Sequence, residues 1–383
     1  MKKIAVVTAT RAEYGILRPL IFRLKKEEDF KVLLYVTGTH LSQQYGNTQT
    51  EILNDGLRID RKIPILEDGN SPYDISLTMA NAVRGFAEAF RDDRPDLLVV
   101  LGDRTELLGI CSAAMNERIP IAHLHGGELT EGAVDDCVRH AVTKMSQLHF
   151  PAAEPYRRRI IQMGEAPERV INVGVLGVEN ILHVPLLTYE QLCREAGIPL
   201  GQDYAVVTFH PVTLELKEVE RQVKPLLCAM KEENQYFYLI TKANADAGGS
   251  MVNDMLEKFV SQTKGTKLTA SLGMVRYLSA VKYSKFVLGN SSSGIIEAPA
   301  LGTPTVNIGD RQKGRLTADT VISCENSKEE ILAAMKKAAQ MEHRVSSVYG
   351  NGSTSEKITK AIKDFLEEKG NHLKKRFYDI END

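Results

Sequence analysis

The chain alternates short apolar segments with longer amphipathic ones, in two successive runs. The first segment, Ile4–Val7, is apolar and β-branched, and a loop and a helical pattern through Lys25 follow it. Strands that alternate with helices predict a parallel sheet with helices on both faces, which is an α/β doubly wound fold. The pattern restarts after Gly197-Ile198-Pro199. We predict strands over Ile4–Val7, Val32–Val36, Asp96–Leu101, Ile119–His125, Leu148–Phe150, Val170–Val173, Tyr204–Phe209, Tyr236–Thr241, Lys267–Ala270, Phe286–Leu288 and Thr305–Ile308.

A length of 383 residues suits two domains of this kind. Gly174 and Gly177 mark the boundary, so we expect an N-terminal Rossmann-like domain over residues 1–178 and a second one over residues 179–354. The last helical pattern, Ser355–Glu368, is expected to return to the first domain together with the C-terminal region, residues 355–383.

The composition excludes several classes of protein. A formal net charge of -2 gives no electrostatic reason to bind nucleic acid or an anionic membrane. Five scattered cysteines predict reduced thiols and a cytoplasmic protein. The apolar run of MKKIAVVTAT is too short for a signal peptide, and no segment has the apolar length of a membrane span.

The segment Phe286–Pro304 carries the strongest indication of a ligand. A strand end is followed by Gly289-Asn290 and then by Ser291-Ser292-Ser293-Gly294, which opens a helix carrying Glu297. Backbone N–H groups at a helix start bind phosphates, and Glu297 could accept hydrogen bonds from ribose hydroxyls. An ordinary serine N-cap followed by a glutamate is the alternative. A serine hydrolase is excluded because the run lacks the G-x-S-x-G elbow.

Other strands also end in polar residues. Arg11 follows the first strand in a loop that lacks G-x-G-x-x-G, so we expect neither a nicotinamide nor a flavin cofactor. Asp103 follows Asp96–Leu101 and could cap the next helix or point into the crevice. Asp135 lies at a helix start, where the helix dipole alone would explain it.

Two histidines raise the possibility of a metal site. His123 and His125 would face the same side of a strand, as zinc ligands do. His140 and His149 do not complete a convincing set of ligands. We therefore expect no metal, and we interpret Gly126-Gly127-Glu128 as backbone that passes close to a ligand.

Seven motifs together resemble those of one family. They are T-x-T-R-A-E-Y-G at 8–15, G-D-R at 102–104, H-L-H-G-G-E at 123–128, D-D-x-x-R-H at 135–140, F-H-P at 209–211, G-N-S-S-S-G-x-x-E at 289–297 and D-R-Q-x-G-R at 310–315. With them the chain resembles the hydrolysing UDP-N-acetylglucosamine 2-epimerases over nearly its whole length. The resemblance implies the glycosyltransferase type B fold, in which two Rossmann-like domains face each other across a cleft.

The resemblance also implies roles for individual residues. Arg11 would contact the diphosphate, Glu297 the ribose, and Tyr277 would pack near the uracil. The expected UDP site comprises Arg11, Tyr277, Gly289, Asn290, Ser291, Ser292, Ser293, Gly294, Glu297 and Arg311. The expected catalytic residues are Asp103 and Asp135, which match the family without departure, then Glu128, His125 and His210. Two departures leave the general base open, because some relatives have a lysine at Ile16 and a glutamate at His125.

The implied reaction is anti elimination of UDP to 2-acetamidoglucal, followed by hydration to N-acetylmannosamine, with no cofactor. Rival functions remain: a retaining glycosyltransferase, a non-hydrolysing 2-epimerase, a sugar-nucleotide sensor, and a metal-dependent amidohydrolase. The sugar could also be the 2,4-diacetamido-2,4,6-trideoxy analogue. We expect a homodimer or homotetramer.

Overall fold

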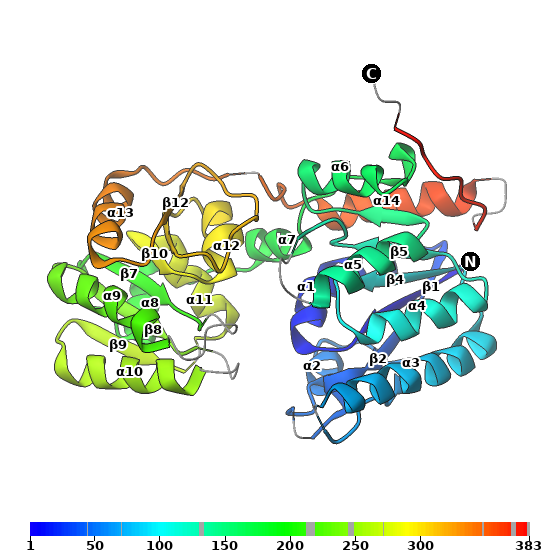
Figure 1. Cartoon of the computed structure of the whole chain (residues 1–383), viewed down its shortest axis with the longest axis horizontal. Helices are drawn as coiled ribbons and strands as arrows, with labels where there is room; N and C mark the ends of the chain where they lie inside the picture. Colours follow the sequence, from blue (N-terminus) through cyan, green and yellow to red (C-terminus); the bar gives the residue numbers. More distant parts are fainter. Residues whose placement is uncertain are drawn as a thin grey trace. The chain divides into compact units, whose positions relative to one another are not determined.

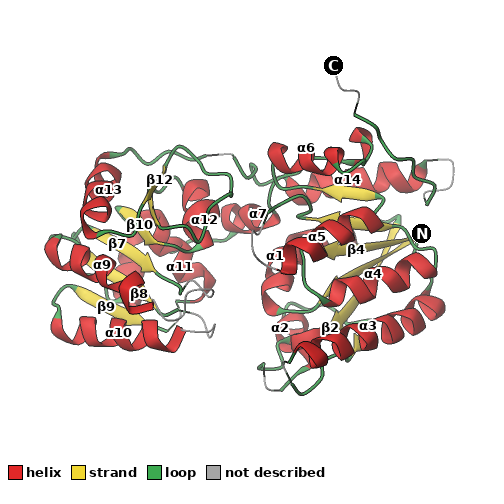
Figure 2. Cartoon of the chain, in the orientation of Figure 1, coloured by secondary structure: helices red, strands yellow, loops and turns green. Residues whose placement is uncertain are grey.

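The computed structural model describes residues 1–43, 45–69, 71–129, 134–211, 219–243, 249–270, 272–346, 348–368 and 373–380. The chain divides into two compact units (Figure 1). Unit 1 contains Met1–Asn180 and Gly350–Asp383, and unit 2 contains Ile181–Tyr349. Each unit is one parallel sheet enclosed by helices (Figure 2).

Unit 1 contains a six-stranded sheet of order β3-β2-β1-β4-β5-β6. The central strands β4 and β5 are buried throughout, because helices cover both faces, and this is why they are continuous apolar runs. The strand order reverses between β1 and β4, so their carboxyl ends border the crevice where such sheets bind ligands. The strands are β1 Lys2–Thr8, β2 Phe30–Thr37, β3 Arg61–Ile63, β4 Leu97–Leu101, β5 Ile121–Leu124 and β6 Leu148–Phe150.

Alternate residues of each strand supply two hydrophobic cores in unit 1. Ile4 and Val6 of β1 pack in a core with α1, α2 and α14, whereas Ala5 and Val7 pack in the core formed with α3, α4 and α5. This is the period-two alternation expected of a sheet buried on both faces. The helices are α1 Arg11–Lys25, α2 Gln49–Asn54, α3 Pro72–Asp93, α4 Glu106–Asn116, α5 Val134–Met145, α6 Glu154–Gln162, α7 Leu176–His183 and α14 Thr354–Glu367, with 3-10 turns at Gly38–Leu41 and Pro167–Arg169.

Helix α14, drawn in red in Figure 1, packs against α1 at the other end of the sequence. The Glu179 carboxylate accepts hydrogen bonds from the backbone N–H of Ser355 at 2.6 Å and from its hydroxyl at 2.5 Å. A carboxylate at a helix N-terminus satisfies unpaired N–H groups and complements the dipole. These contacts fix the start of α14 to the end of unit 1's main segment.

Unit 2 repeats the strand order of unit 1. Its sheet runs β12-β11-β10-β7-β8-β9, and the order reverses between β7 and β10. The carboxyl ends of these two strands therefore border the crevice of the second sheet. The strands are β7 Tyr204–Thr208, β8 Phe237–Thr241, β9 Thr266–Thr269, β10 Phe286–Gly289, β11 Thr305–Ile308 and β12 Val321–Cys324.

The helices of unit 2 also form a core on each face of their sheet. The core that contains Val207 includes side chains of α9, α10 and α13, and the core that contains Val206 includes those of α8, α11 and α12. The bounds are α8 Tyr189–Ala196, α9 Val219–Glu232, α10 Gly249–Gln262, α11 Gly273–Tyr283, α12 Ser292–Leu301 and α13 Lys328–Gln340. The α/β doubly wound fold predicted from the sequence is confirmed in both units.

Some details of the strands differ from the prediction. Val170–Val173 is not a strand, and it contributes only an isolated bridge between Val170 and His149. The short edge strands β3 and β12 were not predicted. Strand β5 ends at Leu124, and His125 has a positive φ of 61°, so the same-side argument for His123 and His125 is wrong.

In the described residues, we find no helix long and apolar enough to cross a bilayer. The five cysteines, Cys111, Cys137, Cys193, Cys228 and Cys324, are all free thiols.

Candidate active site

In unit 1, Asp103 lies just beyond β4 and forms an ion pair with Arg139 of α5. The N-cap of α4 is Thr105, so capping does not explain Asp103. Arg139 is almost completely buried, with only 7% of its side chain exposed. Burial raises the pKa of Asp103, the Arg139 charge opposes this, and the negative charges of Asp135 and Glu128 raise it further.

Three other predicted catalytic residues belong to the same edge of the sheet. Asp135 is in the first turn of α5 and is exposed, and Glu128 lies on the loop that follows β5. The His125 Nδ1 atom is 3.3 Å from Glu128 Oε1. The charges of Asp135 and Glu128 act on Asp103, and Glu128 pairs with His125, so the structure brings Asp103, Asp135, Glu128 and His125 into one acid-rich cluster.

Arg11 is the first residue of α1 rather than part of a loop. Thr10 and Glu13 form a capping box, in which each side chain accepts a hydrogen bond from the other residue's backbone N–H, and this starts the helix earlier than predicted. The Arg11 side chain is 71% exposed and its Nε lies 2.8 Å from Glu51 Oε1 of α2. An exposed pair of this kind is weak, so Arg11 can exchange Glu51 for another anion.

Three further charged residues, Glu13, Arg104 and Glu106, lie at the same strand ends and were given no role in the sequence analysis, although its motifs include the first two. The Glu13 carboxylate accepts hydrogen bonds from the N–H groups of Ala9 at 2.7 Å and Thr10 at 3.1 Å. Burial raises the pKa of Glu13 to about 7. Arg104 Nε is 2.5 Å from Glu106 Oε1, and the Arg104 charge lowers the pKa of Glu13. The T-x-x-E spacing of the capping box was the signal that could have identified Glu13.

The His123 side chain is buried, and both of its ring nitrogens form hydrogen bonds. Its Nε2 lies 2.8 Å from the Gly102 carbonyl oxygen and must donate to it, so Nδ1 accepts from the Thr143 hydroxyl at 3.1 Å. Burial lowers the pKa of His123 to about 3, which keeps the ring neutral. Within the described ranges, no group of three or more His, Cys, Asp or Glu residues is arranged to hold a metal ion.

In unit 2, the ends of β7 and β10 are fixed by Gly289 and Asn290. Gly289 has a φ of 136°, and a Cβ there would lie 1.9 Å from the Thr208 carbonyl oxygen. The Asn290 side chain accepts from the His210 N–H at 2.7 Å and donates to the His210 carbonyl at 2.8 Å. Asn290 thereby holds the backbone of His210, a predicted catalytic residue just beyond the neighbouring strand β7.

The start of α12 follows this turn. Ser291 is its N-cap, and the Ser291 hydroxyl accepts from the Ser293 N–H at 3.3 Å. Ser292 is exposed in the first turn, and Gly294 packs against Thr305 of β11. Ordinary capping and a helix start able to bind phosphate therefore coexist here.

A hydrogen-bonded chain leads from α11 to Glu297. The Tyr277 hydroxyl donates to Ser293 Oγ at 2.8 Å, and the Ser293 hydroxyl bonds to the Glu297 carboxylate. Burial raises the pKa of Glu297, and the Ser293 hydrogen bond opposes this shift. The two predicted ligands Tyr277 and Glu297 are thus connected through Ser293.

Arg311 approaches the same turn from the segment after β11. Its Nη1 donates to the Asn290 carbonyl at 3.1 Å, and Gln312, which the sequence analysis did not single out, donates to the same oxygen at 2.9 Å. The predicted UDP-site residues of unit 2 therefore all lie at the carboxyl ends of β7, β10 and β11 or on the adjoining helices α11 and α12.

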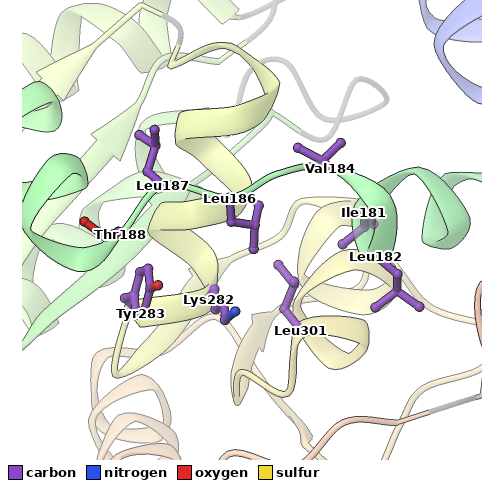
Figure 3. A pocket seen from close by; sticks show the side chains of 9 residues that line it. All are labelled: Ile181, Leu182, Val184, Leu186, Leu187, Thr188, Lys282, Tyr283 and Leu301. Carbon is purple, nitrogen blue, oxygen red and sulfur yellow. The ribbon is translucent and has the colours of Figure 1, made fainter.

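Unit 2 also contains a pocket of about 320 Å³ elsewhere on its surface (Figure 3). Mostly aliphatic side chains line it, from the end of α7, the segment that follows, and the ends of α11 and α12. The lining residues are Ile181, Leu182, Val184, Leu186, Leu187, Thr188, Lys282, Tyr283 and Leu301. They include none of the predicted site residues, so this pocket is separate from the turn at Gly289-Asn290.

Comparison with known proteins relates this arrangement to a family. The sequence model of the family described as UDP-N-acetylglucosamine 2-epimerase matches residues 23–363. A GDP/UDP-N,N'-diacetylbacillosamine 2-epimerase (hydrolyzing) from Campylobacter jejuni is 40% identical over 85% of this chain and 84% of that protein. The polysialic acid biosynthesis protein P7 from Escherichia coli is 38% identical over 99% of this chain and 98% of that protein.

Solved structures share the fold. The UDP-GlcNAc 2-epimerase from Neisseria meningitidis, crystallised bound to UDP-GlcNAc, superposes with a TM-score of 0.79 at 18% identity, covering 95% of this chain and 100% of that one. The glycosyltransferase type B-like architecture predicted from the motifs is confirmed by this likeness. The family match extends over most of the chain, and the resemblance carried by the seven motifs is therefore confirmed: the chain belongs to the UDP-N-acetylglucosamine 2-epimerase family.

Proposed function

We propose that the protein is a hydrolysing nucleotide-sugar 2-epimerase that converts UDP-N-acetylglucosamine and water into N-acetylmannosamine and UDP, for sialic acid-type sugar synthesis. The observation that carries the proposal is the cluster of Asp103, Asp135, Glu128 and His125, in which Asp103 pairs with Arg139 and His125 with Glu128. A sensor that only binds a sugar nucleotide has no need for several proton-transfer groups at adjacent strand ends. The relatives named as hydrolysing epimerases support the reaction type.

In this proposal unit 2 binds the nucleotide. The N–H groups at the start of α12, with Ser291 and Ser292, bind the diphosphate, and Glu297 accepts from the ribose hydroxyls. The Tyr277–Ser293–Glu297 chain orients that carboxylate, and Tyr277 flanks the uracil. Gly289, Asn290 and Gly294 set the backbone close to the phosphates, and Arg311 neutralises charge.

The residues of unit 1, with His210, act on the sugar. A C-2 proton without an adjacent carbonyl is a weak acid, so the rate depends on stabilising the departing diphosphate and the positive charge at C-1. Arg11, Arg311 and His210 supply that stabilisation for the leaving group, and the carboxylates Asp103 and Asp135 stabilise the ring. His125 and the acids transfer protons at C-2. This reaction requires no metal, flavin or nicotinamide.

A second substrate has an observation in its favour. The Campylobacter jejuni relative is named for N,N'-diacetylbacillosamine and for both GDP- and UDP-linked forms. The same chemistry on a 2,4-diacetamido-2,4,6-trideoxy sugar, for legionaminic acid-type sugars, is therefore the alternative proposal. The two substrates differ at C-4 and C-6, remote from the C-2 proton, so one catalytic cluster serves either.

Product analysis tests these proposals. Purified protein is incubated with UDP-N-acetylglucosamine and with UDP- and GDP-linked diacetamido sugars, and the products are identified by NMR. Free N-acetylmannosamine and UDP are the expected products. A UDP-linked epimer would indicate a non-hydrolysing epimerase, and transfer of sugar only to an added acceptor would indicate a glycosyltransferase. The proposed homodimer or homotetramer is measured by sedimentation.

A further inference from the structure

The backbone of His125 adopts a left-handed conformation, which is uncommon for a residue other than glycine. Its φ is 61°, directly after β5 ends at Leu124. A residue other than glycine is strained in the left-handed region, and such residues persist where the surrounding structure fixes them, often at functional sites. The conformation of His125 therefore calls for a reason beyond connecting β5 to α5.

The loop that carries His125 is held from several sides. The His125 N–H donates to the Phe150 carbonyl at 3.0 Å, and the Arg159 guanidinium donates to the Gly127 carbonyl. Gly127 has a φ of 77°, and a Cβ there would lie 2.5 Å from the Tyr156 carbonyl oxygen, so the loop fits closely against α6. Contacts outside the loop thus impose the strained geometry, and they place the imidazole rigidly.

The imidazole is arranged as the basic half of a dyad. Its Nδ1 lies 3.3 Å from Glu128 Oε1, and the two side chains are 17% and 19% exposed. Its Nε2 is buried and has no hydrogen-bond partner among the described residues. A carboxylate beside Nδ1 keeps the proton on Nδ1, which leaves the lone pair on Nε2.

Two of the neighbouring carboxylates are already paired with basic side chains. Asp103 pairs with Arg139, and Glu128 pairs with His125. A buried polar atom without a partner is unfavourable in a purely structural role. We propose that His125 is the base that removes the C-2 proton, with Nε2 as the accepting atom and Glu128 as the residue that positions the ring. This inference rests on the proposed function.

The step balances as a simple elimination. Nε2 takes the proton from C-2, the electrons of the C–H bond form the C-1–C-2 double bond, and the C-1–oxygen bond breaks with its pair leaving on UDP. The products are 2-acetamidoglucal, UDP and an imidazolium ion stabilised by Glu128. Water then adds across the double bond, with hydroxyl at C-1 and a proton at C-2.

The second proton must arrive on the opposite face of the ring, because the configuration at C-2 is inverted. The same Nε2 atom, held rigidly by its loop, cannot serve both faces of one bound sugar. A different group therefore delivers the second proton, and the elimination and hydration steps should respond differently to loss of His125.

The test compares those two steps in His125→Asn. Asparagine tolerates the left-handed backbone but offers no basic nitrogen, so the loop is preserved while the base is lost. Turnover of the UDP-sugar should fall by roughly 100-fold or more. Hydration of 2-acetamidoglucal supplied together with UDP should stay within about threefold of the wild-type rate, and UDP affinity by calorimetry should not change.

Two further sets of variants sharpen the result. Glu128→Gln keeps an acceptor for Nδ1–H, so it should retain more elimination activity than Glu128→Ala. His140→Asn is the matched control, because His140 also pairs with a carboxylate, Asp136 at 3.5 Å, but on the regular helix α5. Turnover of His140→Asn should match the wild type.

Several outcomes would overturn the dyad. His125→Asn could turn over the UDP-sugar at a near-normal rate, could lose both steps equally, or could lose no more than His140→Asn. A wild-type protein that neither consumes nucleotide sugars nor hydrates the glycal would instead remove the proposed function, and the dyad with it.

Discussion

The two sheets have the same strand order, yet the carboxyl ends of their strands are built from different chemistry. In unit 1 these ends carry ionised and titratable groups that hold one another, such as Asp103 with Arg139 and Arg104 with Glu106. In unit 2 the corresponding turn is held mainly by the neutral Asn290 amide on the His210 backbone, with Arg311 donating to the Asn290 carbonyl. One edge is organised by charge and the other by backbone geometry.

The difference suits the two halves of the proposed substrate. A diphosphate that is already charged is bound by N–H and hydroxyl dipoles that do not change protonation state. A sugar that must lose and regain a proton needs groups whose pKa values are shifted by burial and by neighbouring charges. Apart from Arg11 and His210, substitutions at the site in unit 2 should therefore alter nucleotide affinity or stability, whereas those at the site in unit 1 should alter turnover.

The largest effect is expected from Gly289→Ala, which disrupts the backbone turn after β10 in unit 2. Its Cβ would overlap the Thr208 carbonyl at 1.9 Å, and alanine strongly disfavours a φ of 136°. We expect a loss of stability of roughly 3 kcal/mol or more, measured by urea unfolding, together with loss of UDP binding.

Gly201→Ala is the matched control for that substitution. Gly201 also has a positive φ, 82°, but a Cβ added there would meet no atom within 4 Å. Only the cost of the backbone conformation remains, about 1–2 kcal/mol. Equal losses in the two variants would show that close approach at Gly289 is not what holds the turn.

The next largest effect is expected from Asp103→Asn, which tests the charged residues at the carboxyl ends of the strands of unit 1. Asp103→Asn keeps an oxygen for Arg139 but removes the negative charge, so turnover should fall by about 100-fold. UDP affinity by calorimetry should remain near normal, because all the proposed nucleotide contacts except that of Arg11 lie in unit 2. Asp136→Asn, one residue from Asp135 on the same helix, should keep its turnover. Near-normal turnover of Asp103→Asn would make the Asp103–Arg139 pair structural.

Much of this architecture was predictable because the determining signals are local. The buried strands β1, β4 and β7 are uninterrupted apolar runs, and Gly289-Asn290-Ser291 combines turn and capping residues at one strand end. The edge strands β3 and β12 escaped prediction because three or four residues of mixed polarity give no periodicity. Val170–Val173 has β-branched residues and lies beside the edge strand β6, but it forms only the single bridge between Val170 and His149 and no ladder.

The pairings within the site were not predictable, since they join distant parts of the chain. Nothing in the sequence relates Asp103 to Arg139, or Tyr277 to Ser293 and Glu297. The strand predicted through His125 hid the positive φ that separates His125 from His123. A clustering of Asp103, Glu128 and Asp135 nevertheless follows from the predicted fold, because parallel strands place their carboxyl ends at one edge.

A smaller effect is expected from Glu297→Ala in unit 2. The variant should keep its fold, because Glu297 is only partly buried, but the ribose would lose its charged acceptor. Loss of such a contact costs about 1.5–3 kcal/mol, or roughly 10–150-fold in UDP affinity. Ser293→Ala, which removes only the group orienting Glu297, should weaken binding less. Unchanged UDP affinity in Glu297→Ala would remove this carboxylate from the nucleotide site.

The smallest effect is expected from chelators, which test whether the charged edge of unit 1 works through a metal. Both ring nitrogens of His123 are engaged, by Gly102 and Thr143, and the positive φ of His125 separates the two histidines that a strand would have paired. A ligand set built on that pair is therefore absent from the described residues. Dialysis against EDTA should leave turnover of the UDP-sugar unchanged. Turnover that was lost with EDTA and restored by zinc would show that proton transfer by His125 and the acids does not suffice. The catalytic residues of unit 1 would then require a metal ion, whereas the nucleotide site of unit 2 would not.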